Sequence, residues 1–264
     1  MGCRYPIWWA DIQSLAPGTD LGTLSLPPVE TSGSVFRINS GDGSSEYLLL
    51  ENRQRTGFDE HLLDSGLLVW HIDPVTIAEE PFGGINNDPN RMGVWLRQAD
   101  GQNDLGSQDG GRGDAGDPFP GPSGNDNFHA GTTPSSWTHD GKAMGITLMG
   151  IQELGETVSF QALTRYQTLT LRTEGAPSGA GLISLDGVPS ESAVWPANSA
   201  PFQHHVFEAA IGEVVEAGVR VGFQGWEDGA PRVREHTTLL EDASFTAVYG
   251  GTEFLVSVTT NDPA

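Results

Sequence analysis

One span of the chain, residues 100–126, concentrates residue types that bind metal ions. It contains eight glycines, one arginine and the aspartates Asp100, Asp104, Asp109, Asp114, Asp117 and Asp126. Neighbouring carboxylates repel one another unless a cation or solvent screens them. Ca²⁺ takes about six to eight oxygen ligands, and glycine lets backbone carbonyls turn toward an ion. We therefore predict a calcium site with Asp100, Asp104, Asp114 and Asp117 as ligands.

The same span also fits a solvated turn region that binds no ion, and the residues alone leave both interpretations open. No D-x-[DN]-x-[DN]-G string is present, so the span is not an EF-hand. Zinc is not expected there, because zinc prefers histidine and cysteine in a small tetrahedral shell. A structureless segment this long inside a domain is usually either functional or disordered.

Charged residues at the end of an apolar run, Glu51 and Arg53, also have types that could do chemistry. Strand alternation puts both side chains on one face. A carboxylate aimed at a substrate is one interpretation. The favoured one is an ion pair that fixes the strand end, because buried charges need a partner. Asp59 is interpreted as a turn or cap residue.

The histidines give weaker signals. His71 and Asp73 share a face of the next strand and could form a general base or a metal ligand, although a structural histidine is favoured. His204 and His205 point in opposite directions on a strand, and we expect both at the surface. Nucleophilic catalysis finds no support, because there is no G-x-S-x-G string and Cys3 has no activating neighbour.

Strands must position these residues. The 35 glycines, 17 prolines and hydrophobic fraction of 37% favour short strands and turns over helices, so the fold class is predicted as all-β. Apolar patterns between turn residues predict strands at residues 47–52, 66–73, 93–98, 145–149 and 157–163. Both faces of residues 66–73, GLLVWHID, are apolar, which predicts a central strand covered on both sides.

A new set of alternating strands begins after Tyr166, so we place a domain boundary near Arg165. Residues 208–217 fit either a short helix or an edge strand. The expected cores are Leu67, Leu68, Val69, Trp70 and Ile72 in the first domain and Phe223, Trp226, Phe245, Tyr249 and Val256 in the second.

The charge of the chain excludes two classes of partner. It has 13 basic and 35 acidic residues, a formal net charge of −22, so a phosphate backbone or an anionic membrane surface would be repelled. No apolar run is long enough to insert into a membrane. The single cysteine rules out an intrachain disulfide and a cysteine zinc cluster.

Three strings, ENRQ, WHID and GDAGDPFPG, occur in one order in the first domain. Together with WLRQADGQNDLGS they resemble the region that follows the catalytic core in secreted bacterial metallopeptidases of the immune inhibitor A type. The resemblance implies a zinc site on an HExxH helix, but no HExxH occurs in this chain. Zinc is therefore expected only in an upstream catalytic domain, and no catalytic residue is assigned here.

The last hundred residues resemble a bacterial surface-repeat module of the internalin B-repeat type. The match lies in GFQGWEDGAPRVREHTTLLEDASFTAVY, with its Trp-x-Asp-Gly turn at Trp226 and its closing strand at Tyr249. Such modules are small β-grasp-like domains, which is the fold that the resemblance implies for this region.

The prediction is a β-sandwich domain, residues 1–164, followed by a small β-grasp-like repeat domain, residues 165–264. The resemblance implies a secreted or cell-surface protein whose first domain supports an upstream catalytic domain that cleaves proteins or peptides. The alternative is a calcium-stabilised β-sandwich that binds glycan or protein surfaces, which an exposed aromatic row beside the aspartate span would favour. A hydrolase using two facing carboxylates is a third, weaker possibility.

We expect the purified chain to show no zinc-dependent hydrolysis of casein, because it lacks the three zinc ligands of a zincin. The measurement is release of labelled peptides, with an active zinc protease as the positive control. Activity that survives purification and disappears with a zinc chelator would contradict the prediction.

Overall fold

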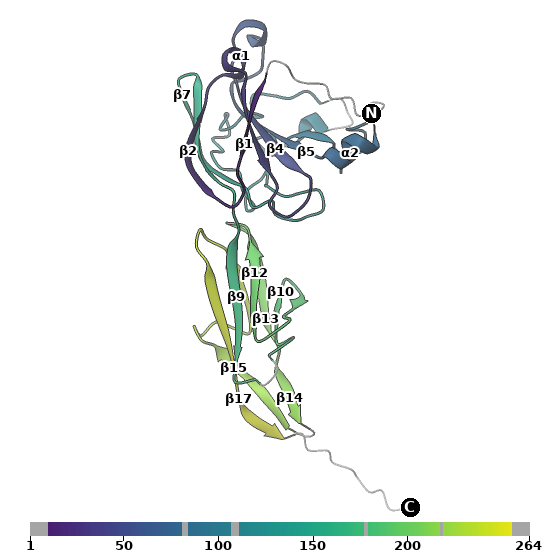
Figure 1. The fold of residues 1–264 in the computed structure, drawn as a ribbon, viewed down its shortest axis with the longest axis vertical. Helices are drawn as coiled ribbons and strands as arrows, with labels where there is room; N and C mark the ends of the chain where they lie inside the picture. The colour runs from purple at the N-terminus through teal and green to yellow at the C-terminus, as the bar shows by residue number, and fades with distance from the viewer. Residues whose placement is uncertain (1–9, 81–83, 107–110, 177–178, 217–218, 255–264) are drawn as a thin grey trace, which may run out of the picture. The chain divides into compact units, whose positions relative to one another are not determined.

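The computed structural model describes residues 10–80, 84–106, 111–176, 179–216 and 219–254. It is mostly β, with 46% strand and 7% helix, which confirms the expected class in its coarse form. The chain divides into two compact units, Met1–Tyr166 and Gln167–Ala264 (Figure 1). Among the described helices, none has the length and apolar character needed to cross a membrane.

The described residues of the first unit form two sheets. One has the order β1-β3-β4-β5-β6 and the other the order β2-β8-β7. The strands are β1 (Asp11–Leu15), β2 (Asp20–Leu26), β3 (Ser34–Asn39), β4 (Tyr47–Arg53), β5 (Gly66–Ile72), β6 (Val94–Leu96), β7 (Thr147–Leu154) and β8 (Thr157–Leu163). The short helices are α1 (Val29–Ser32) and α2 (Pro74–Glu79), with 3₁₀ turns at Gly57–Asp59 and Asp104–Gly106. In the five-stranded sheet β1 pairs with β3 in parallel, and the other neighbours are antiparallel.

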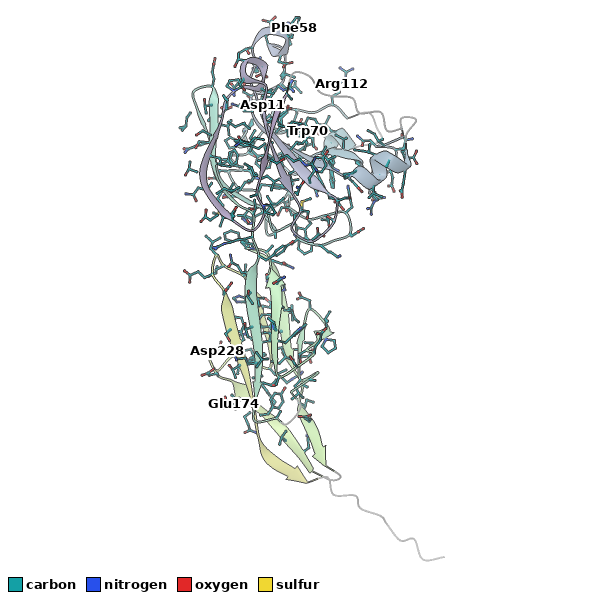
Figure 2. The ribbon with its side chains drawn as sticks, viewed as in Figure 1. Asp11, Phe58, Trp70, Arg112, Glu174 and Asp228 are labelled. Carbon is teal, nitrogen blue, oxygen red and sulfur yellow. The ribbon has the colours of Figure 1, made fainter. Side chains whose placement is uncertain are left out.

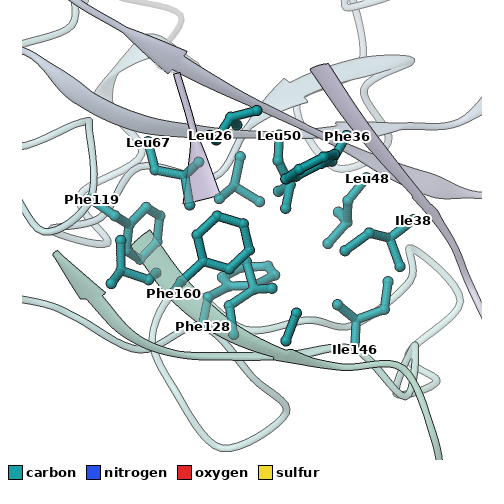
Figure 3. Close-up of a cluster of buried hydrophobic side chains, with 14 of the residues drawn as sticks. Leu26, Phe36, Ile38, Leu48, Leu50, Leu67, Phe119, Phe128, Ile146 and Phe160 are labelled. Carbon is teal, nitrogen blue, oxygen red and sulfur yellow. The ribbon is translucent and has the colours of Figure 1, made fainter. Parts of the chain in front are cut away.

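Alternation along the strands explains where the core lies. Leu48 and Leu50 of β4 point to one face of the large sheet and are fully buried, as are Leu67 and Val69 of β5. They meet side chains of the small sheet, such as Phe160, and of the loops between the sheets (Figure 3). Packing of one sheet face against the other is therefore the main apolar contribution to this unit.

The other face of β5 is covered only in part. Leu68 and Trp70 are half-buried, whereas the sequence predicts complete cover on both sides. The difference has a physical reason: loops rather than a second sheet lie over that face, and they leave two hollows on it.

Buried polar side chains form hydrogen bonds at the edges of the core. The amide of Asn52 at the end of β4 donates to the carbonyl oxygens of Leu26 at 2.8 Å and Glu156 at 2.7 Å, so one side chain links the two sheets. Asp73 ends β5 and begins α2, because its carboxylate accepts from the backbone N–H of Val75 and Thr76. Pro74 occupies the first helical position, where no N–H is needed.

The second unit also contains two sheets, with the orders β12-β9-β17-β15-β14 and β11-β10-β13-β16. The strands are β9 (Gln167–Glu174), β10 (Ile183–Leu185), β11 (Val188–Pro189), β12 (Val194–Ser199), β13 (His204–Ala209), β14 (Gly212–Glu216), β15 (Val219–Trp226), β16 (Val233–Thr237) and β17 (Ala243–Phe254). Residues 212–216 form an edge strand, which resolves the choice between helix and strand.

The core of the second unit is aromatic. Trp226 is 3% exposed, and its ring centroid lies 6.4 Å from that of Phe207 and 6.3 Å from that of Phe223. Tyr249 is buried and donates to the carbonyl oxygen of Leu182 at 2.8 Å. The predicted core residue Val256 lies outside the described residues.

Replacing Trp226 with alanine should lower the free energy of unfolding of the second unit by about 3 to 5 kcal/mol, because it empties the aromatic core. The first unit should melt as in the parent, since each unit has its own core. Calorimetry with limited proteolysis distinguishes the two transitions. One cooperative transition, destabilised as a whole, would show that the units do not fold separately.

Candidate functional site

Backbone pairing brings the aspartate span together beside β6. The N–H of Ala99 donates to the carbonyl oxygen of Asp117 at 2.9 Å, and that of Asp100 donates to Gly116 at 3.1 Å. The backbones of Asp100 and Asp117, which are 17 residues apart in sequence, are therefore adjacent. The four predicted ligands nevertheless fall into two groups, one around Gln98 and one around Gly116.

The first group is Gln98, Asp104 and Asp117. The side-chain amide nitrogen of Gln98 contacts one carboxylate oxygen of Asp104 and one of Asp117. Gln98 is 2% exposed, and its amide oxygen has no hydrogen-bond partner. Burial raises the pKa of Asp117, and the nearby charges of Asp104 and Asp114 raise it further.

The second group is Asp100 and Asp114, which close turns. The carboxylate of Asp100 accepts from the backbone and side-chain N–H groups of Gln102, both at 2.9 Å. Asp114 accepts from the N–H of Gly116 at 2.5 Å. A Cβ on Gly116 would lie 2.4 Å from a carboxylate oxygen of Asp100 and 2.9 Å from one of Asp114, so glycine allows this close approach without displacing either side chain. The carboxylate of Asp126 accepts from the side-chain amide of Asn127, and Asp109 lies outside the described residues.

The predicted ion pair of Glu51 and Arg53 is present. The guanidinium of Arg53 lies 3.1 Å from Glu51 and 2.9 Å from Asp59, so the turn at Asp59 is tied to β4. Glu51 also accepts from the indole N–H of Trp70 at 3.0 Å. These contacts use the carboxylate of Glu51 for structure, as the favoured interpretation expects.

His71 is paired with Glu46 rather than with Asp73. Its Nε2 lies 2.6 Å from a carboxylate oxygen of Glu46, which also accepts from the backbone N–H of His139 at 3.1 Å. Asp73 instead caps α2 and pairs with Arg91 at 3.1 Å. Glu46 and His71 are both buried, and no sequence motif links either of them to His139.

Glu46, His71 and His139 could hold a metal ion, because one ligand atom from each lies within 4.8 Å of the others. The imidazole rings of His71 and His139 are stacked, however, with an interplanar angle of 16° and centroids 4.7 Å apart. A histidine binds a metal ion in the plane of its ring, so two histidines that share one ion have ring planes that meet at the ion. The stacked rings of His71 and His139 lie in nearly parallel planes instead. One ring would have to rotate, and Nε2 of His139 is held 2.9 Å from the carbonyl oxygen of Met92.

A buried arginine stands close to the same group. The guanidinium of Arg97 lies 3.7 Å from the ring centroid of Trp95, which stacks on both histidines. Burial lowers the pKa of Arg97 to about 10, although the negative charge of Glu46 acts in the opposite direction and raises it. Arg97 therefore stays charged at neutral pH and offsets the carboxylate. This arrangement favours a structural network over a metal centre.

The second unit contains a hydrogen-bonded chain of the kind found in serine hydrolases. Nε2 of His205 lies 2.7 Å from the hydroxyl of Ser199, and its Nδ1 lies 2.6 Å from the carboxylate of Asp186. Ser199 has no exposed surface and also lies 2.6 Å from the hydroxyl of Thr238. A nucleophile must reach its substrate, so these contacts act as an internal brace.

The expectation that His205 lies at the surface was wrong. It is 3% exposed, while its neighbour His204 is exposed as expected. Alternation on β13 turns His205 toward the core, where Ser199 and Asp186 satisfy both ring nitrogens.

Comparisons of the chain with protein-family models, with curated proteins and with solved structures gave no significant match.

The first unit should lose stability as the pH falls from 7 to 5.5. Burial lowers the pKa of His71, while its hydrogen bond to the carboxylate of Glu46 opposes the shift. The folded state therefore takes up the proton later than the unfolded state, so the free energy of unfolding falls as the pH drops below about 6.5. Burial lowers the pKa of His129 as well and adds to the slope.

Replacing His71 with glutamine should reduce this slope by at most about 1.4 kcal/mol per pH unit, the contribution of one proton. Urea unfolding at several pH values measures it. The matched control is His61→Gln, because the His61 side chain is 90% exposed. Equal slopes in the two variants would show that His71 does not titrate differently on folding.

Proposed function

We propose that the first unit is a non-catalytic β-sandwich that supports the catalytic domain of a secreted zinc metallopeptidase, and that the second is a surface-repeat-like β-grasp module. The strings ENRQ, WHID and GDAGDPFPG suggest the first assignment. Their polar residues, among them Asn52, His71 and Asp117, are buried and bonded within the unit. Polar side chains that are buried and bonded within the unit suit a supporting domain better than a catalytic one.

The observation that carries the proposal is a face of the large sheet that the described loops cover only in part. One hollow of about 230 Å³ has only apolar residues and Glu51 in its walls: Ala10, Ile12, Val35, Leu49, Trp70, Ile72 and Val94. A second hollow, of about 380 Å³, shares Trp70 and Glu51 with it. Its other lining residues are the apolar Leu62, Leu63, Leu68, Leu96, Leu105 and Pro118, with Gly113 and the polar Arg53, His61, Asp64, Asp114 and Asp117 at its edges. We call these two hollows together the apolar face.

The apolar face has the character of a contact surface. Leu63 is 58% exposed and Leu105 is 46% exposed, and Phe58 stands fully exposed in the turn before them (Figure 2). Contiguous apolar surface of this kind usually marks an interface in a soluble protein.

A binding module for another protein is the second candidate. It is favoured by the exposed side chains of Phe58, Leu62 and Leu63, which lie on one short loop and could insert into a partner. The two candidates differ in what covers the apolar face: a domain of the same polypeptide or a separate molecule.

Sequencing the coding region before Met1 tests the leading proposal first. An in-frame HExxH supports it, and a stop codon followed by a ribosome-binding site contradicts it. In the longer protein, Leu63→Asp should lower both the melting temperature and the yield of active protease, because it places a charge in the contact.

The control is Leu154→Asp on β7, since Leu154 is 59% exposed and lies away from the apolar face. This variant should behave like the parent. If Leu63→Asp also matches the parent in the longer protein, the face does not support the catalytic domain.

A further inference from the structure

We propose that Gln98, Asp104 and Asp117 bind one Ca²⁺ ion, with the amide oxygen of Gln98 as a ligand beside the two carboxylates. Three observations point to this site: the placement of the amide, the lack of a neutralising partner for the carboxylates, and the backbone that holds them. The inference does not depend on the proposed function, because it concerns a site within the first unit alone.

The amide of Gln98 is almost fully buried and points at both carboxylates. Its nitrogen contacts one oxygen of each, while its oxygen is buried without a partner. A rotation by 180° about the last side-chain bond exchanges the two atoms without changing the shape of the group. The oxygen then faces Asp104 and Asp117, and a cation between the three oxygens would offset the repulsion among them.

The carboxylates lack a basic partner. In the part of the chain that the structure describes, none of the ion pairs involves Asp104, Asp114 or Asp117. Asp117 is 7% exposed and has two other carboxylates nearby. A divalent cation would remove this repulsion, because the group would then carry little net charge.

The geometry fits a large, oxygen-binding ion. Two carboxylate oxygens that contact one amide nitrogen lie within the span of two ligands of one Ca²⁺, about 5 Å across the ion. The second carboxylate oxygen of Asp117 accepts from the N–H of Asp114 at 3.0 Å, which fixes its orientation. Gly113 allows the loop to pass close to Asp117, since a Cβ there would collide with the carboxylate.

The site refines the ligand set expected from sequence. Asp104 and Asp117 remain as ligands and Gln98 joins them. Asp100 and Asp114 have turn-closing hydrogen bonds instead and contribute charge around the ion. Asp117, Asp114 and Leu105 also line the larger hollow, so a bound ion would fix one wall of the apolar face.

Calcium titration of the chelator-treated full chain tests the proposal. Isothermal calorimetry should give one Ca²⁺ per chain. At a free calcium concentration a hundred times Kd, the ratio of folded to unfolded first unit should rise about a hundredfold, seen as a higher melting temperature. Magnesium at the same concentration should have a smaller effect, because it demands a tighter octahedral shell.

Two variants separate a ligand role from a folding defect. Asp104→Asn and Gln98→Met should each abolish the calcium-dependent shift in melting temperature. Without calcium, Asp104→Asn should melt at or above the parent temperature, because it removes a repulsive charge. The matched control, Asp126→Asn, removes one charge from an exposed residue of the same span and should keep the full calcium shift.

No calcium binding by the parent, or an equal calcium shift in Asp104→Asn and Asp126→Asn, would overturn the site. Binding that survives Gln98→Met would remove the amide oxygen from the ligand set and contradict the proposal as stated. The outcome is independent of whether a catalytic domain precedes the chain.

Discussion

Burial of two sheet faces against each other is the constraint on which the first unit depends. Burial alternates along Leu48–Leu50 of β4 and Leu67–Trp70 of β5, so the side chains that fill the core leave the positions between them facing outward. That outward face has no second sheet over it, and the loops that cross it leave it partly open. The same alternation therefore produces both the stable core and the surface that a partner could cover.

Polar side chains at the rim of this core hold the loops in place. Asn52 joins the two sheets, Asp73 starts α2, and Arg53 ties down the turn at Asp59. Each is largely withdrawn from water and has a bonded partner, as buried polar groups require. Some buried side-chain atoms have no hydrogen-bond partner, among them Nε of Arg53 and the amide oxygen of Gln98. The unpaired oxygen of Gln98 belongs to an amide that contacts two carboxylates, which makes it informative.

Much of the strand pattern could be predicted from the sequence. The predicted strands at residues 47–52, 66–73 and 157–163 lie within one residue of β4, β5 and β8, because apolar runs and turn residues mark them clearly. β1 and β2 carry mostly exposed residues, so periodicity gives no signal for them. Predicted residues 145–149 overlap only the start of β7, which continues to Leu154 through Gly150, the buried Ile151 and the exposed Gln152 and Glu153.

Sites built across long sequence separations were harder to predict. Local repulsion among aspartates indicated the acidic span, but the buried partner Gln98 could be found only once β6 placed it there. The pairing of His71 with Glu46, and that of His205 with Ser199 and Asp186, depends on cross-strand neighbours. The alternation of side chains along a strand predicts the face on which a residue lies. Which residue it contacts on the next strand depends on how the strands pair.

The stack of Trp95 with His71, His139 and Arg97 has an optical consequence. The ring centroid of Trp95 lies 6.3 Å from that of the buried His71. A protonated imidazole quenches indole fluorescence more strongly than a neutral one. The guanidinium of Arg97 already lies against this indole, so a second cation in the stack is disfavoured. A change in the emission of Trp95 would therefore accompany protonation of His71, without any added label.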